Sequence, residues 1–564
     1  MEALDWLVIG VFFLALIGII VWVVRQKQND SADYFLGGRD ATWLAIGASI
    51  FASNIGSEHL IGLAGAGASS GMAMAHWEIQ GWMILILGWV FVPFYTRSMV
   101  YTMPEFLERR YNPQSRTILS VISLVSYVLT KVAVTVYAGG LVFQQVFGIK
   151  ELWGIDFFWI AAIGLVVLTA LYTIFGGMKS VLYTSVLQTP ILLLGSLIIL
   201  VLGFKELGGW DEMMRVCGAV TVNDYGDTMT NLIRSNDDAN FPWLGALIGS
   251  AIIGFWYWCT DQFIVQRVLS GKNEMEARRG TIFGAYLKLL PVFLFLIPGM
   301  IAFALHQKYI GAGGEGFLPM LANGTANADA AFPTLVAKLL PAGVKGLVVC
   351  GILAALMSSL ASLFNSSAML FTIDFYKRFK PGTPEKKLVG IGQIATIVIV
   401  VLGILWIPIM RSVGDVLYTY LQDVQSVLAP GIAAAFLLGI CWKRTSAQGG
   451  MWGLISGMVI GLTRLGAKVY YSNAGEVADS TFKYLFYDMN WLFFCGWMFL
   501  FCIIVVIVVS LATEAPTAEK IQGLVFGTAT KEQKAATRAS WNHWDIIHTV
   551  IILAITAAFY WYFW

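Results

Sequence analysis

Long apolar stretches recur along the chain and constrain its fold more than any other feature. A membrane-spanning helix needs about 20 mostly apolar residues, and roughly fourteen stretches approach that length. They fall near residues 5–25, 41–68, 76–98, 114–147, 156–176, 180–203, 243–268, 280–306, 343–377, 388–411, 414–441, 447–471, 490–512 and 545–563. Only 12% of the residues are charged, which excludes a water-soluble core of this size. The sequence therefore predicts an all-α integral membrane protein with about fourteen transmembrane helices.

The second apolar stretch, at 41–68, carries polar residues at its centre. They are Ser53, Asn54, Gly56, Ser57, Glu58 and His59. Small residues let a helix unwind, and unwound backbone at membrane depth is tolerated only where it faces protein or a water-filled cavity. Close packing through small residues would explain the glycines and alanines, but not the acid, amide and imidazole groups. We interpret this stretch as an interrupted helix that binds a solute or an ion.

Two blocks of five spans, 41–203 and 243–441, form a second pattern. An odd number of crossings in each block means that the second is inserted upside down relative to the first. Inverted repeats of this kind share a site near mid-membrane, built from the broken first helix of each block. The first helix of the second block contains Gly245, Gly249, Gly254 and an aromatic run that ends at the acid Asp261. We expect this helix to be interrupted as well.

The remaining segments complete the predicted organisation. Residues 1–40 would form a leading helix and the first cytoplasmic loop, 204–242 an extracellular loop, and 442–564 additional C-terminal helices. Lysine and arginine are concentrated in alternate short loops, which the positive-inside rule assigns to the cytoplasm. With an even number of spans, both termini would be extracytoplasmic. The prediction is a multi-pass protein of the plasma (inner) membrane.

Seven short motifs, in order along nearly the whole chain, resemble those of the sodium/solute symporter family. They are FASNIGSEH (51–59), YTMPEF (101–106), GGMKSV (176–181), WYWCTDQFIVQR (256–267), YLKL (286–289), LMSSLASLFN (356–365) and FLLGICWKR (436–444). Within that family the chain resembles the sodium/glucose cotransporters. The resemblance implies a LeuT-like inverted-repeat bundle of five plus five core helices with flanking helices.

The resemblance also implies sugar contacts. They fall on Asn54, His59, Glu78, Tyr257, Trp258, Lys288 and Gln422. Sugar hydroxyls need both donors and acceptors, and carboxylate, ammonium, amide and imidazole groups supply them. Aromatic rings suit the C–H faces of a sugar. The alternatives are packing or an interfacial belt for the aromatic residues, and a structural ion pair with Glu78 for Lys288.

Apolar gates cover the sugar site in the family. By position they would be Leu63, Trp77 and Tyr418 on the outer side, with Tyr257 beneath. Trp77 and Tyr418 differ in size or type from the gate residues of some family members, so the details of the gate should differ. For Leu63, packing in the protein core is the competing interpretation.

A sodium site is implied by the same resemblance. Its ligands would be backbone or hydroxyl oxygens of Ala52, Ile55, Ala355, Ser358 and Ser359. An unwound turn offers carbonyl oxygens to a monovalent cation, whereas serines in a helix also bond back to their own backbone. Members with a second sodium site usually carry aspartate at the position of Ser185. We therefore expect Na+ as the cotransported ion, with one sodium per sugar.

These observations predict a sodium-coupled secondary active symporter that takes up a neutral monosaccharide of the glucose or galactose type by alternating access. The alternative is uptake of inositol or another small polar solute. An intramembrane enzyme is disfavoured, because Ser57 and His59 are two apart and would not face each other in a helix. A receptor is disfavoured because the segment 513–544 is too short for a signalling domain. We expect no nucleic acid and no obligate protein partner.

Overall fold

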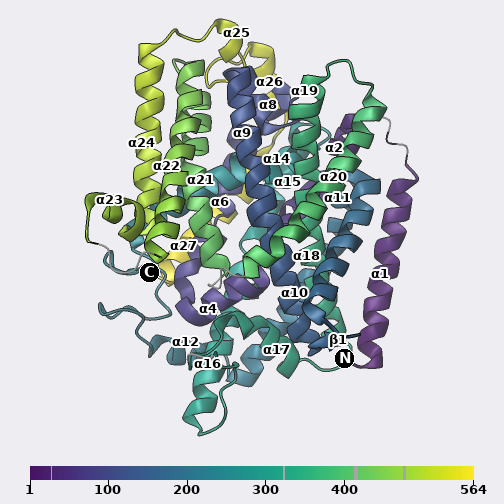
Figure 1. The fold of residues 1–564 in the computed structure, drawn as a ribbon, viewed down its shortest axis with the longest axis vertical. Helices are drawn as coiled ribbons and strands as arrows, with labels where there is room; N and C mark the ends of the chain where they lie inside the picture. Colours follow the sequence, from purple (N-terminus) through teal and green to yellow (C-terminus); the bar gives the residue numbers. More distant parts are fainter. Residues whose placement is uncertain (27, 29, 57, 322–323, 412–416, 474–477) are drawn as a thin grey trace.

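The computed structural model describes residues 1–564 except 27, 29, 57, 322–323, 412–416 and 474–477. The side chains of 129–130, 145, 409–411, 417–421 and 473 are also outside this description. Long helices stand side by side in one bundle (Figure 1). Helix α1 (Ala3–Val24) forms one edge, and α22 (Ala447–Asn473) and α24 (Trp491–Ala512) form the other. Both termini lie in the lower half of the view.

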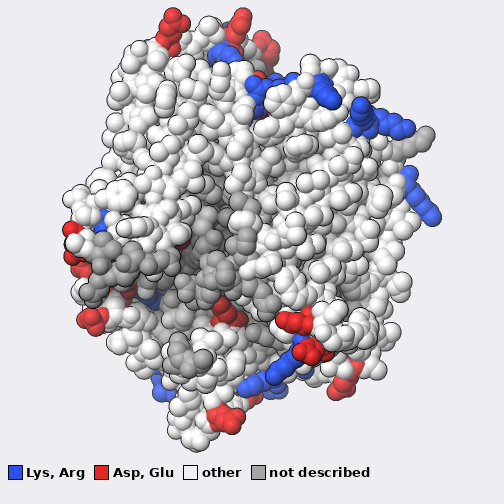
Figure 2. All heavy atoms as spheres, viewed as in Figure 1, with Lys and Arg blue, Asp and Glu red and all other residues white. Residues whose placement is uncertain are grey.

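Apolar helices of membrane-spanning length dominate the bundle. Within the described residues, ten helices are long and apolar enough to cross a membrane. One of them, α11 (Phe157–Leu207), has 51 residues and turns at Gly177, whose φ of 53° is left-handed. It contains two of the stretches that the sequence separates, so the predicted total of about fourteen stays a prediction. Most charged side chains in Figure 2 lie toward the upper and lower ends of the molecule.

The first interrupted helix is present where the sequence predicts it. Helix α3 (Trp43–Asn54) is followed by Ile55, whose ψ of 107° is extended. The chain becomes helical again in the π-turn η2 (Glu58–Leu63) and continues as α4 (Ala64–Ser70). A break of this kind can free backbone groups of a helix to bind ligands.

The second interrupted helix is also confirmed. Helix α13 (Trp243–Gly254) widens into the π-turn η6 (Phe255–Thr260) and ends at Asp261, whose ψ is 127°. The Asp261 side chain accepts a hydrogen bond from the Phe263 amide and so caps the next helix, α14 (Gln262–Leu269). An acid therefore lies at or beside the break in each of the two helices.

Helix α15 (Glu274–Lys288) packs along α3, and α16 (Ile297–Gly311) packs along α4. The approach is close because glycines remove side chains at the contacts. A Cβ at Gly280 would lie 2.6 Å from the Ile46 side chain, and one at Gly299 would overlap the Ala64 carbonyl. The π-turn η7 (Val292–Leu296) separates α15 from α16. Each half of the first broken helix is thus fixed to a different half of the 274–311 segment.

The other elements up to residue 218 surround these helices. They are α2 (Ser31–Leu36), η1 (Gly37–Arg39), η3 (Gly71–Met74), α5 (Ala75–Glu78), α6 (Gly81–Ile86), η4 (Leu87–Phe91), α7 (Val92–Ser98), α8 (Met103–Arg110), α9 (Pro113–Ser126), η5 (Tyr127–Val132), α10 (Ala133–Phe147), β1 (Glu151–Leu152), β2 (Ile155–Asp156) and α12 (Trp210–Gly218). The two strands form an antiparallel hairpin with Glu151 opposite Asp156.

The later elements close the bundle. They are η8 (Ala328–Ala330), α17 (Ala331–Leu339), α18 (Val344–Met369), η9 (Leu370–Tyr376), α19 (Lys377–Phe379), α20 (Glu385–Arg411), α21 (Leu417–Cys441), α23 (Thr481–Lys483), η10 (Tyr484–Asp488), α25 (Ala518–Ile521), α26 (Lys531–Ala539) and α27 (His543–Tyr562). Helix α18 packs against α3 and α11, and α21 contacts both π-turns, η2 and η6. The two breaks therefore lie together inside the bundle.

Candidate functional site

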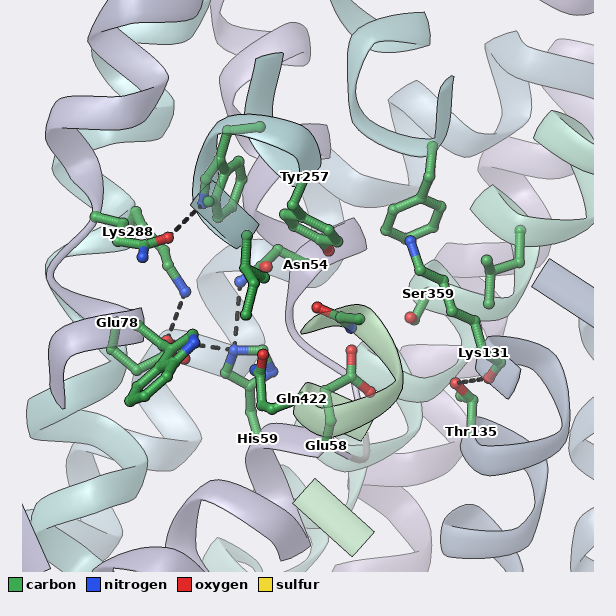
Figure 3. A pocket seen from close by; sticks show the side chains of 18 residues that line it. Asn54, Glu58, His59, Glu78, Lys131, Thr135, Tyr257, Lys288, Ser359 and Gln422 are labelled. Carbon is green, nitrogen blue, oxygen red and sulfur yellow. Dashed lines mark hydrogen bonds and ion pairs between the residues drawn. The ribbon is translucent and has the colours of Figure 1, made fainter. Parts of the chain in front are cut away.

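A narrow cavity of about 60 Å³ lies between the two interrupted helices. All seven sugar contacts expected from the sequence line it: Asn54, His59, Glu78, Tyr257, Trp258, Lys288 and Gln422. They come from segments that are far apart in the chain, and the fold brings them together around one space (Figure 3).

One wall of the cavity is a chain of paired polar groups. The Lys288 ammonium lies 2.6 Å from Glu78 Oε2, and His59 Nε2 lies 3.3 Å from the same oxygen. Asn54 Nδ2 is 3.3 Å from His59 Nε2. These contacts follow one another across Figure 3, and the side chains of Lys288 and Glu78 are at most 4% exposed. Each buried charge on this wall therefore has a counter-charge, which its burial requires.

Aromatic rings line the side of the cavity next to the second break. Trp258 donates from Nε1 to Gln80 Oε1 at 3.3 Å, and Gln80 donates in turn to the Ser250 carbonyl at 2.8 Å. The Lys288 ammonium lies 5.3 Å from the centre of the Trp258 ring. Tyr257 meets Trp258 edge to face at 4.9 Å between ring centres. The rings are thus held in fixed orientations beside the polar wall.

The acid at the second break is fully paired. Asp261 Oδ2 accepts from the Lys131 ammonium at 2.6 Å, and Oδ1 accepts from the Tyr127 hydroxyl. The ammonium also lies 4.8 Å from the Tyr257 ring and 4.7 Å from the Phe263 ring. An ion pair inside a cage of aromatic rings fixes the lysine beneath Tyr257.

The structure brings part of the expected sodium site together. The Ser358 hydroxyl donates to the Ala52 carbonyl at 2.5 Å and to the Ala355 carbonyl at 2.9 Å. Ile55 ends α3 beside this contact, and Ser359 lines the cavity. Carbonyl and hydroxyl oxygens from the broken helix and from α18 are the hard, oxygen-based donor set that suits a sodium ion.

At the second sodium position, neutral groups surround Ser185. Its hydroxyl donates to the Val181 carbonyl at 2.6 Å and lies 3.5 Å from the Ser49 hydroxyl. Ser53 and Ser362 share a hydrogen bond of 2.6 Å nearby. The hydroxyl groups of both serine pairs therefore have hydrogen-bond partners, and none of these groups carries a formal charge.

The expected gate residues have different surroundings. Trp77 and Tyr257 line the cavity, and the Trp77 ring stacks on Trp491 with 5.5 Å between ring centres. Leu63 is completely buried in the core and is not part of the cavity wall as described. The side chain of Tyr418 lies outside the described residues. The gate roles of these residues stay predictions.

Several other polar residues line the cavity and were not predicted as site residues. They are Glu58, Gln80, Lys131, Thr135 and Gln425. Lys131 stands in the apolar stretch 114–147, and a lysine within a membrane span is itself a signal of function. Glu58 belongs to the polar cluster at the first break, but nothing in the sequence indicated which way its side chain points.

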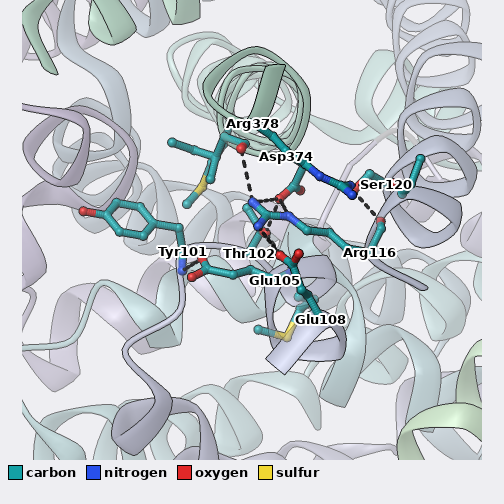
Figure 4. A network of polar contacts seen from close by, with 12 residues as sticks. Tyr101, Thr102, Glu105, Glu108, Arg116, Ser120, Asp374 and Arg378 are labelled. Carbon is teal, nitrogen blue, oxygen red and sulfur yellow. Dashed lines mark hydrogen bonds and ion pairs between the residues drawn. The ribbon is translucent and has the colours of Figure 1, made fainter. Parts of the chain in front are cut away.

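A separate polar network lies away from the cavity (Figure 4). Asp374 Oδ1 accepts from Arg116 Nε at 2.7 Å and from the Thr102 hydroxyl at 2.8 Å. Arg116 also pairs with Glu108 at 2.6 Å. The network joins α8 and α9 to the turn after α18, and none of these residues lines the cavity. It fastens one end of the bundle.

Membrane helices that break around a shared, buried polar cavity define a secondary transporter. Comparison with known proteins gives the particular family: the model of the "Sodium:solute symporter family" matches residues 34–457, and the chain belongs to this family. The family predicted from the motifs is therefore confirmed. It makes the protein a multi-pass, sodium-coupled membrane transporter and not an enzyme.

Similar proteins include two kinds of cotransporter. The chain is 37% identical to "Sodium/myo-inositol cotransporter 2" of Mus musculus over 542 residues, which cover 94% of this chain and 80% of the relative. It is 36% identical to "Sodium/glucose cotransporter 4" of Danio rerio over 537 residues, 92% of this chain and 80% of the relative.

Among solved structures, a Na+-coupled sialic acid symporter has a TM-score of 0.72 and 22% identity, and the match covers 92% of this chain and 99% of that one. At this identity the likeness concerns the fold alone. It confirms the predicted LeuT-like inverted-repeat fold.

Proposed function

We propose that the protein uses the sodium gradient to take up a neutral monosaccharide of the glucose or galactose type by alternating access. The observation that carries this proposal is the pairing of Lys288 with Glu78 and of Lys131 with Asp261, each at 2.6 Å. Both lysines on the described cavity wall thus already have a carboxylate partner. A substrate carboxylate would have to compete for one of them, whereas hydroxyl groups can use the donors and acceptors as they stand.

Individual residues take the roles expected from the sequence. Seven side chains would contact the sugar: Asn54, His59, Glu78, Tyr257, Trp258, Lys288 and Gln422. Sodium would bind to oxygens of Ala52, Ile55, Ala355, Ser358 and Ser359. One sodium per sugar is supported by the neutral surroundings of Ser185. One sodium crossing about 100 mV releases roughly 2.3 kcal/mol, enough to concentrate a neutral solute more than tenfold.

The proposal extends to the arrangement in the membrane. The blocks 41–203 and 243–441 would be the two inverted repeats that move relative to each other around the cavity. The protein would lie in the plasma (inner) membrane with both termini extracytoplasmic. The common position of the two termini in the lower half of Figure 1 supports an even number of crossings.

The second candidate substrate is myo-inositol. Several similar proteins are named as sodium/myo-inositol cotransporters, at 35–37% identity, and the cotransporter named for glucose is equally similar at 36%. Inositol and glucose each present a six-membered ring with hydroxyls around it and C–H faces. The described cavity wall offers the same kinds of contact to both rings.

Uptake into reconstituted vesicles tests the proposal. Labelled glucose, galactose and myo-inositol are each supplied with an inward sodium gradient, and with potassium as the control. Sodium-driven uptake of a hexose that is lost in His59→Ala and Ser359→Ala would support the sugar and ion contacts together. Uptake of inositol alone would show that inositol, and not a hexose, is the substrate. Equal uptake with sodium and with potassium would refute the ion site.

A further inference from the structure

Glu58 is an acid on the cavity wall that the proposed sugar and ion contacts do not use. It is the first residue of η2, directly after the break in the first helix. Among the described residues, its carboxylate has no hydrogen bond or ion pair with another side chain, whereas Glu78 and Asp261 each hold a lysine at 2.6 Å. No dashed contact reaches Glu58 in Figure 3.

The Glu58 carboxylate lies close to the proposed sodium site. A Cβ added at Gly56 would be 2.5 Å from Glu58 Oε2 and 3.0 Å from Ser359 Oγ. The two oxygens therefore converge on the same point of the broken backbone, and only a glycine leaves that space open. Ser359 comes from α18, so this point joins the two elements that the sodium site also joins.

An ionised carboxylate without a partner is costly inside a membrane protein. The two lysines on the described cavity wall are committed to other acids, Lys288 to Glu78 and Lys131 to Asp261. Moving either lysine to Glu58 would strand the acid that it leaves. A mobile cation from solution would neutralise Glu58 without breaking either pair.

We propose that Glu58 is a charged ligand of the cotransported sodium ion, which binds between its carboxylate and the Ser359 hydroxyl at the break of the first helix. The inference rests on the proposed sodium site and adds to it a formal negative charge. Glu58 also lines the solute cavity, so the ion changes the charge of the wall that the sugar meets. Sodium and sugar are then coupled through one side chain.

Sodium binding in the absence of sugar tests this role. Binding of ²²Na+ to the purified protein is measured in choline buffer for the wild type, Glu58→Gln, Glu58→Asp and Ser358→Ala. We expect Glu58→Gln to weaken sodium binding about tenfold or more, and Glu58→Asp to weaken it less. Sugar affinity at saturating sodium should change less than about twofold, because the Glu58 carboxylate binds the ion and not the sugar.

The opposite pattern would overturn the proposal. If Glu58→Gln binds sodium normally but loses sugar affinity at saturating sodium, the carboxylate binds sugar hydroxyls instead. Glu514→Gln, an exposed acid near the end of α24, serves as the matched control and should change neither affinity. If Glu58→Gln cannot be purified, Glu58→Asp provides the test. Normal sodium affinity together with weaker sugar binding in Glu58→Asp would also refute the proposal.

Ser358→Ala separates this inference from the proposed sodium site. Loss of sodium binding in Ser358→Ala but not in Glu58→Gln refutes the role of Glu58 and leaves the site standing. Loss in Glu58→Gln but not in Ser358→Ala supports Glu58 and requires a new set of neighbouring ligands. Normal binding in both variants refutes both assignments.

Discussion

The two interrupted helices resemble each other in outline but differ in how they treat their acids. At the second break, Asp261 holds Lys131, Tyr127 and the amide of the next helix. At the first break, Glu58 faces the cavity without such a partner among the described residues. At the second break the acid is therefore neutralised by the protein's own groups, whereas at the first break our proposal assigns this role to a bound sodium ion.

The largest effect should come from filling the space at the first break. Gly56→Ala would place a methyl group 2.5 Å from Glu58 Oε2 and 3.0 Å from Ser359 Oγ. We expect sodium-driven uptake to fall by about a hundredfold or more, since displaced ligands cannot be recovered by small shifts. Vesicle uptake measures this. Gly164→Ala, where a Cβ meets nothing within 4 Å, is the control and should transport normally.

Removing the acid at each break should have opposite effects on stability. Asp261→Asn strands the buried Lys131 and should lower the free energy of unfolding by about 3–5 kcal/mol. Glu58→Gln removes a charge that forms no ion pair with a described side chain and should leave stability in sodium-free buffer unchanged or higher. Thermal unfolding in detergent compares the two. An equal loss of stability in both variants would contradict the proposed difference between the two breaks.

A third acid extends the comparison to the segment between α16 and α18. Asp329 packs against Gly65 of α4, and burial raises the pKa of its carboxyl from 3.8 to about 6. Because the pKa is raised in the folded state, ionisation of Asp329 above pH 6 lowers the free energy of unfolding by about 3 kcal/mol. This loss of stability disappears as the pH falls towards 4. Asp329→Asn should therefore raise the unfolding temperature at pH 7.5, with a gain that shrinks on acidification. A gain independent of pH would contradict this.

The smallest effect should come from the second-break side of the cavity wall. Trp258→Phe keeps an aromatic ring but removes the hydrogen bond from Nε1 to Gln80. The loss of one hydrogen bond of about 1 kcal/mol predicts about fivefold weaker sugar binding, with sodium affinity unchanged. Equilibrium binding of labelled sugar at saturating sodium measures it. A change in sodium affinity would show that the two walls are not independent.

Much of the fold could be predicted from the sequence. Both breaks follow from glycines and acids inside apolar stretches, and the structure confirms them at Ile55 and Asp261. The seven proposed sugar contacts were implied by the family resemblance, and all of them line one cavity. The direction of each side chain was not predictable, because it depends on packing between distant helices. For that reason Glu58 and Lys131 were missed as parts of the wall.

The number of spans and the gate stay predictions. Hydropathy separates 156–176 from 180–203, and the non-helical backbone at Gly177 divides α11 between these two stretches. The family resemblance placed Leu63 at a gate by position; its side chain is buried, and its role as a gate stays a prediction. Sequence patterns record the chemistry of each segment, while the path of the backbone and the contacts between helices arise only in the folded chain.

The glycine contacts of α15 and α16 have a mechanical consequence. Because α3 is locked to α15 through Gly280 and α4 to α16 through Gly299, neither half of the first broken helix can rotate alone. A bend at Ile55 and Gly56 would require a matching bend near η7, between the two partner helices. The four helices then move as two rigid pairs, α3 with α15 and α4 with α16. The pairs can only bend relative to each other about one common hinge.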